Sequence, residues 1–172
     1  MGLDMYLYMN KYEVAHCYKI ENGKKLPKNF YPKELEQLKQ DILKRSFLSK
    51  ETKYHVGYWR KFNALHWWIV KNCANEEDNC GEIYLSVEDI EKLLKVCLKV
   101  MMDHSKASEL LPSKSGFFFG NTEYDDWYFD NLEYTINLLQ KIIELIKKQT
   151  KEEDPDSAAH CYEWDIIYQA SW

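Results

Sequence analysis

The sequence predicts an α+β fold in which a small antiparallel sheet, made of an N-terminal hairpin and a C-terminal strand, packs against about four helices. Apolar and polar residues alternate near both ends of the chain, at Leu3–Met9 and at Tyr162–Gln169, as in half-buried strands. Long segments between these ends carry apolar residues at helical spacing. Because a single C-terminal strand needs a partner, we expect it to pair with the N-terminal hairpin and to bring the two termini together.

The N-terminal strand is expected to bury one of its two faces. Asp4 lies on the polar face. The apolar face consists of Leu3, Met5, Leu7 and Met9. Asn10 and Lys11 are typical of a turn, and Val14–Ile20 predicts a second, weaker strand. The turn-forming residues Glu21–Gly23 would then close the hairpin.

Two helices are predicted in the first half of the chain. Pro32 suits the first turn of a helix, where its missing N–H costs nothing, and this helix should fade near Ser46. The second helix, Tyr58–Cys73, is apolar on several sides. We therefore expect it to be surrounded by other elements and to form the structural axis of the protein.

Two further helices are predicted in the second half, after a short strand at Glu82–Leu85. Ser86 and Asp89 form a capping-box pattern that opens an amphipathic helix. Asp125 and Asp126 suit the start of the last helix, which should end near Lys148. The charged segment Thr150–Ser157, which contains Pro155, predicts a flexible connection to the final strand.

Length and composition indicate a single domain spanning residues 1–172. The net charge of −5 argues against nucleic acid as the main partner, because phosphate groups attract basic surfaces. The five cysteines lack the regular spacing of a secreted disulfide scaffold, which indicates the cytoplasm. No apolar run approaches the ~20 residues of a membrane span, and Asp4 lies where a signal peptide would be positively charged. We expect no membrane association.

The best candidate site lies on the predicted helix at Tyr58–Cys73. Arg60, Asn63 and His66 recur every three residues, so on a helix they could serve one surface, with Lys61 beside them. An arginine, an amide and an imidazole together would suit a phosphate or carboxylate group. In the alternative, structural interpretation, Arg60 is paired with a carboxylate such as Asp4 and His66 binds a backbone carbonyl.

The segment Ser115–Asp126 contributes the remaining candidates. Gly116 and Gly120 bracket three phenylalanines, which predicts a short buried strand, tight turns or a close backbone approach to a ligand. Tyr124 and Asp125 follow, although Asp125 is explained equally by capping the next helix. The full set of candidate ligand-binding residues is Asp4, Arg60, Lys61, Asn63, His66, Tyr124 and Asp125.

No metal or cofactor is expected. The carboxylates have no spacing that is diagnostic of Mg²⁺ or Ca²⁺. The dipeptides His16-Cys17 and His160-Cys161 would lie on paired strands, but neighbouring strand residues point to opposite faces, so each dipeptide could supply only one zinc ligand. Glycine-rich nucleotide loops and the serine-hydrolase GxSxG pattern are absent from the sequence.

Three stretches in the same order, MGLDMYL, YWRKFNALHWW and SGFFFGNTEYDDWYFDNLE, resemble an uncharacterised family of small proteins of bacteriophages and prophages. Its members share the patterns GLDMYL, YWRKxNxIHxW and SGFFFGxxxYDxxYFxDL, and the departures of this chain from them include Leu65 in place of isoleucine. The resemblance implies a viral origin and the cytoplasm of the host. It implies no activity and no catalytic residues.

Two functions follow as hypotheses. The first is a non-enzymatic phage accessory protein that binds a host or phage protein and counters a host defence; it is favoured by small size, lack of a catalytic signature and a surplus of aromatic residues, which anchor interfaces. The second is a binder or enzyme for a phosphorylated or otherwise anionic small molecule such as a nucleotide, acting through Arg60, Lys61, Asn63 and His66.

Overall fold

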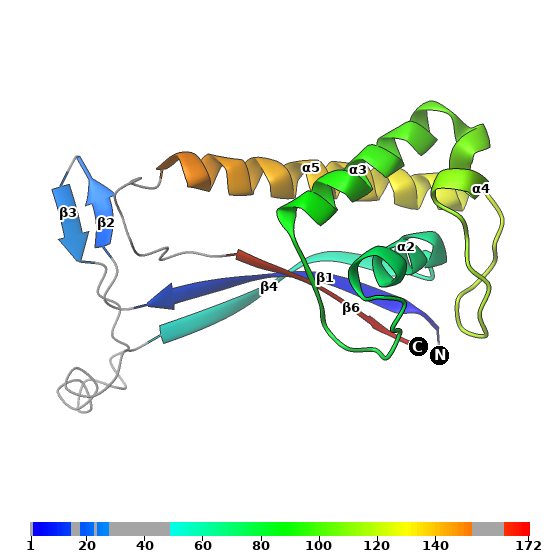
Figure 1. Cartoon of the computed structure of the whole chain (residues 1–172), viewed down its shortest axis with the longest axis horizontal. Coiled ribbons are helices and arrows are strands. Elements are labelled where there is room, and N and C mark those ends of the chain that lie inside the picture. Colours follow the sequence, from blue (N-terminus) through cyan, green and yellow to red (C-terminus); the bar gives the residue numbers. More distant parts are fainter. Residues whose placement is uncertain (1, 15–17, 23, 28–48, 153–163) are drawn as a thin grey trace.

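A computed structural model describes residues 2–14, 18–22, 24–27, 49–152 and 164–172. It confirms the α+β class: a four-stranded antiparallel sheet lies on one side and the long helices lie on the other (Figure 1). The sheet has the order β4-β1-β6-β5, with β1 at Asp4–Val14, β4 at Ser49–Arg60, β5 at Ile83–Leu85 and β6 at Trp164–Ser171. The described helices are α2 (Asn63–Cys73), α3 (Val87–Met102), the 3₁₀ turn η2 (His104–Lys106), α4 (Ala107–Leu110) and α5 (Asp126–Glu152).

The central strand β1 buries the face that its alternation predicts. Leu3, Met5, Leu7 and Met9 are all buried in the core beneath the helices. The predicted turn at Asn10 and Lys11 is wrong, because β1 continues through both residues to Val14. Neighbours on both sides pair with these two positions, so tertiary pairing overrides their turn preference.

The predicted N-terminal hairpin is also different from the observed one. Tyr18–Glu21 forms β2, which pairs with β3 (Lys24–Pro27) in a separate two-stranded sheet. Asn22, at a φ of 52°, lies between these strands, where the turn was expected. The neighbour of β1 in the main sheet is instead β4, a strand that the sequence did not indicate.

The start of the predicted central helix is wrong. Tyr58, Trp59 and Arg60 end β4, and the helix α2 begins only at Asn63. Lys61 lies between the two elements with a φ of 64°, a left-handed conformation that interrupts both strand and helix. The expected burial is confirmed, since α2 buries residues on several sides.

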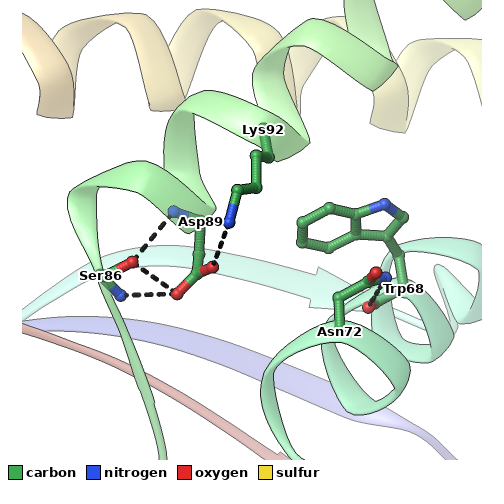
Figure 2. Close-up of polar contacts among 5 residues, drawn as sticks. All are labelled: Trp68, Asn72, Ser86, Asp89 and Lys92. Carbon is green, nitrogen blue, oxygen red and sulfur yellow. Dashed lines mark hydrogen bonds and ion pairs between the residues drawn. The ribbon is translucent and has the colours of Figure 1, made fainter.

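The helices of the second half are confirmed. Ser86 and Asp89 form the capping box at the start of α3: the Ser86 hydroxyl accepts the N–H of Asp89, and an Asp89 carboxylate oxygen accepts the N–H of Ser86 (Figure 2). The helix α5 starts where predicted but runs to Glu152. Thr150 therefore belongs to the helix and not to the predicted connection.

The C-terminal strand β6 pairs with β1 as expected, and the chain ends lie near each other (Figure 1). The predicted short strand is β5, which pairs with the far side of β6. Within the described residues, no helix is long and apolar enough to cross a membrane. Four predictions lie outside the described residues, in whole or in part: the helix that begins at Pro32, the flexible connection beyond Glu152, and the dipeptides His16-Cys17 and His160-Cys161.

Candidate functional site

The predicted site residues do not form one cluster. The strand β4 and the turn after it carry Arg60 and Lys61 near the end of the sheet, whereas α2 carries Asn63 and His66 into the interior. The helical spacing that would have joined them does not exist, because residues 60 and 61 precede the helix. Each candidate is therefore described with its own surroundings.

His66 is buried in a network of side chains. It is 1% exposed. Its Nδ1 lies 2.7 Å from the Tyr168 hydroxyl on β6, and its Nε2 lies 3.0 Å from an oxygen of Asp78 in the loop after α2. The rings of Phe119, Tyr168 and Trp172 pack around the imidazole. This differs from the expected bond to a backbone carbonyl, but the role is still an internal one.

Burial determines the protonation of this network. Burial lowers the pKa of His66, and the hydrogen bond to Asp78 opposes that shift only in part. The neutral imidazole then donates its Nε2–H to Asp78 and accepts the Tyr168 hydroxyl at Nδ1. Burial also raises the pKa of Tyr168 well above its ordinary value.

The order carboxylate, imidazole, hydroxyl is one that enzymes use to activate a nucleophile. Here the hydroxyl of Tyr168 is completely buried, and the adjoining cavity of about 10 Å³ has room for roughly one water molecule. This cavity is too small for a substrate. The network joins α2, the loop after it and β6, so its contribution is to stability.

Asn63 uses its side chain to hold the loop between α4 and α5. Its Nδ2 donates to the carbonyls of Phe119 (2.9 Å) and Asn121 (2.8 Å), and its Oδ1 accepts the N–H of Lys114 (2.9 Å). Both N–H groups of Nδ2 and one lone pair of Oδ1 are thus bonded to loop backbone. We call residues 113–121 the phenylalanine loop.

Arg60 and Lys61 remain close to each other at the surface. The glycine at position 2 has no Cβ, and one placed there would lie 3.7 Å from Lys61 Nζ and 3.8 Å from Arg60 Nη2. The stem of Lys61 also packs on Gly120, which has a φ of 86°. The two cationic groups therefore converge on one small area, beside the phenylalanine loop.

Asp4 lies opposite Arg60 in the register of β1 and β4. The ion pair that the structural interpretation expects between them stays a prediction. The Oδ1 of Asp4 accepts a hydrogen bond of 2.5 Å from the Tyr58 hydroxyl. That hydrogen bond raises the pKa of Tyr58, while the nearby Arg60 lowers it. Asp4 thus belongs to the outer side of the sheet, away from His66.

The last two candidates have local structural roles. Asp125 caps α5, since its Oδ1 accepts the N–H of Tyr128 at 3.0 Å. The hydroxyl of Tyr124 accepts the N–H of Ser113 at 3.2 Å, which ties the start of the phenylalanine loop to the segment that follows the loop. The capping interpretation of Asp125 is therefore the one that its contacts support.

Sequence reasoning did not single out Asp78 or Tyr168, the two hydrogen-bonding partners of His66. A histidine predicted on a largely apolar helix needs polar partners, which is a usable signal. It does not indicate which of the acids in the loop after α2 is the partner, because loop conformation decides that. Tyr168 was predicted in the C-terminal strand, but without a partner.

The tip of the phenylalanine loop presents an unusual feature. Phe117 is 96% exposed, although the residues around it are firmly held. Phe118 accepts the N–H of Leu3 through its carbonyl, and the N–H of Phe119 bonds the carbonyl of Gly116. The predicted buried strand does not form here, and the glycines instead serve a tight turn.

Comparison of the chain with protein-family models, with curated proteins and with solved structures finds no match. Among the described residues, no group of three or more histidine, cysteine, aspartate or glutamate side chains is placed to hold a metal ion.

Proposed function

We propose that this chain is a bacteriophage accessory protein that acts by binding a host or phage protein in the host cytoplasm, and that such binding serves to counter a host defence. The viral part of the proposal rests on the three sequence patterns. The binding part rests on one observation, the exposure of Phe117 at the tip of a loop that is held in place.

A fixed, exposed phenylalanine has the properties of an interface anchor. Burying such a ring against a partner contributes about 1.5–3 kcal/mol. Because Asn63, Leu3 and Tyr124 already hold the loop by hydrogen bonds, little conformational entropy is lost when a partner binds. Within the described residues the ring contacts the ring of Phe118, at 4.8 Å between centroids, and its surface is otherwise exposed, so we infer that it is kept for contact.

The test is affinity capture from lysate of host cells with the wild-type protein and two variants. Phe117→Ala should reduce recovery of the partner about tenfold, which corresponds to about 1.4 kcal/mol. Met102→Ala is the matched control, because Met102 is 87% exposed at the end of α3, on a different element. Failure to recover any protein in a Phe117-dependent way, even at low salt with crosslinking, would contradict the proposal.

The alternative, an anionic small molecule such as a nucleotide, is favoured by the convergence of Arg60 and Lys61 at Gly2. A thermal-shift screen with nucleotides separates the two functions. A specific ligand at 100 times its Kd stabilises by about 2.7 kcal/mol, which for a chain of this size raises Tm by roughly 5–10 °C. If protein binding is the function, no nucleotide should produce this shift; a shift that Arg60→Ala abolishes would favour the alternative.

A further inference from the structure

The sheet has a second face, which is turned away from the helices. We call it the outer face; on β1 and β4 it consists of the residues that alternate with the core set, namely Asp4, Tyr6, Tyr8, Asn10, Tyr12, Glu51, Lys53, His55, Tyr58 and Arg60. Figure 1 shows the long helices gathered over the opposite side of this sheet. Where the structure describes it, the outer face is thus built mainly by the strands and is not covered by the long helices.

Four rings on this face touch one another. Tyr6 lies 5.4 Å from Tyr58, 5.5 Å from His55 and 6.2 Å from Tyr8, measured between ring centroids. Tyr8 lies 4.4 Å from His55. These four residues, called the aromatic patch, come from two neighbouring strands, and Tyr58 and His55 are exposed. Such a platform offers π-faces to a ligand.

The surroundings of the aromatic patch are acidic. Lys53 on this face is already paired with Glu82 at 2.7 Å. The described strands also place three carboxylates here, those of Asp4, Glu51 and Asp165, and one guanidinium, that of Arg60. Three negative charges and one positive charge give a net charge of −2. The loop before β5 also reaches this face, where the Gln169 side chain donates to the Cys80 carbonyl.

The face also has an unused hydrogen-bond acceptor. Asn10 is 6% exposed and donates from Nδ2 to Glu51, but its Oδ1 has no hydrogen-bond partner among the described residues. A buried acceptor without a donor costs about 1–3 kcal/mol. The face therefore holds an acceptor that its own described residues leave without a donor, which favours a donor-rich ligand.

The protein itself displays how a cation is held here. The Nζ of Lys53 lies 4.1 Å from the centroid of the Tyr8 ring while it is paired with Glu82. An ammonium group over a tyrosine ring with a carboxylate beside it is the arrangement by which aromatic and acidic surfaces recognise basic side chains. Aromatic rings could also stack nucleic-acid bases, but the net negative charge of the face repels phosphates.

We propose that the outer face is a docking site for a basic segment of a partner protein, whose arginine or lysine side chains lie over the aromatic patch and pair with the carboxylates around it. This rests on the proposed function in one respect, that the chain acts by binding protein. It concerns a different surface from Phe117 and specifies the charge of the bound segment.

The test is a fluorescence-anisotropy titration of the full chain with three labelled probes: a peptide of alternating arginine and glycine, the matching glutamate and glycine peptide, and an oligothymidine. The arginine peptide should bind at least about tenfold more tightly than the other two at low salt, and its affinity should fall as salt screens the carboxylates. Tighter binding of the oligothymidine or of the glutamate peptide overturns the proposal.

Variants locate the binding. The double variant Asp4→Asn/Glu51→Gln keeps both hydrogen-bond acceptors and removes two charges, and it should weaken the arginine peptide about tenfold. The matched control, Glu133→Gln/Glu144→Gln, removes two charges from exposed positions of α5 and should have no effect. Equal loss in both double variants would indicate general electrostatic attraction and would refute a site on this face.

Two further variants complete the test. Tyr6→Leu removes the ring at the centre of the aromatic patch without changing charge, and it should weaken the arginine peptide several-fold; unchanged binding means that the rings take no part and refutes the site as described. Phe117→Ala should leave peptide binding unchanged. The proposal for the outer face is therefore tested independently of the proposal that Phe117 anchors a partner.

Discussion

His66 is the residue at which site and structure are most easily confused. Its imidazole is buried, and both ring nitrogens have side-chain partners. These two hydrogen bonds join α2 to β6 and to the loop that holds Asp78. Such a residue affects stability in proportion to the difference between its folded and unfolded pKa values.

The stability of the protein should therefore fall below neutral pH. His66 has a lowered pKa when folded, while the unfolded chain titrates near 6.5. As pH falls from 6.5 towards the folded pKa, His66 is protonated in the unfolded state but stays neutral in the folded state. The free energy of unfolding therefore decreases. Urea denaturation followed by tryptophan fluorescence between about pH 8 and pH 5 measures this loss.

Two variants test the assignment. His66→Gln should flatten the pH dependence between the two pKa values. Asp78→Asn removes the group that raises the pKa of His66, so the loss of stability should extend to lower pH. A wild-type slope that His66→Gln leaves intact would show that another group titrates.

Residue types alone indicated that Asn63 and His66 have a specific role, but they did not indicate which role. Both were grouped with Arg60 because a three-residue spacing lines up on a helix. The conformation of Lys61, at a φ of 64°, breaks that helix without a glycine or proline to announce it. The loop-holding role of Asn63 depends on backbone atoms of residues 114–121, about fifty positions away, which no local pattern specifies.

At the scale of single elements, α3 shows what local sequence can predict. Its start is fixed by the capping box of Ser86 and Asp89, a signal confined to four residues, and its apolar side, which includes Leu93 and Cys97, recurs at helical spacing. Both signals are local, so the helix and its N-terminus were predicted correctly.

The capping box gives a quantitative prediction. Ser86→Ala should lower the free energy of unfolding by about 1 kcal/mol at neutral pH, since the N–H of Asp89 loses its partner. The hydrogen bond from Ser86 is also the main reason for the lowered pKa of Asp89. That contribution exists above the unfolded pKa of about 3.8 and disappears as pH falls through the folded one, so the effect of the mutation should shrink in acid.

Thermal unfolding at about pH 7 and about pH 3 measures both parts of this prediction. Ser108→Ala, at an exposed position of the short helix α4, is the control and should change Tm little. A Ser86→Ala variant as stable as this control at neutral pH would mean that the box does not stabilise α3.

The strand β4 shows the opposite case. Its sequence, SKETKYHVGYWR, is largely polar, and it acquires its role by pairing with β1 over eleven positions. The register shifts between Leu7 and Tyr8, so the alternation that would announce a strand is broken in its middle. Long-range pairing and the bulge depend on tertiary structure and leave no local pattern in the sequence, so β4 was not predicted. The strand β6 was predicted because its apolar and polar residues alternate.

At the scale of the whole molecule, the main question is what holds the helix layer to the sheet. Gly57 allows close approach, because a Cβ there would lie 2.6 Å from Leu138 Cδ2 on α5. Beside it, the indole N–H of Trp59 donates to the Thr135 hydroxyl at 2.9 Å. Both groups are buried, and the Thr135 hydroxyl in turn donates a hydrogen bond to the Asn131 carbonyl. This buried polar contact therefore joins β4 to α5, and at the exposed edge of the same interface the Tyr58 N–H donates to the Tyr134 hydroxyl at 3.4 Å.

Thr135→Val should consequently cost more than its small change in shape suggests. It keeps the volume of the side chain but leaves the Trp59 N–H buried without an acceptor, which costs about 1–3 kcal/mol and lowers Tm by roughly 2–12 °C. Thr122→Val, at an exposed position, is the matched control. In a Trp59→Phe background the donor is already gone, so Thr135→Val should then cost little, and the difference between the two backgrounds isolates the pair. Equal costs in both backgrounds would place the stabilisation of this interface in apolar packing alone.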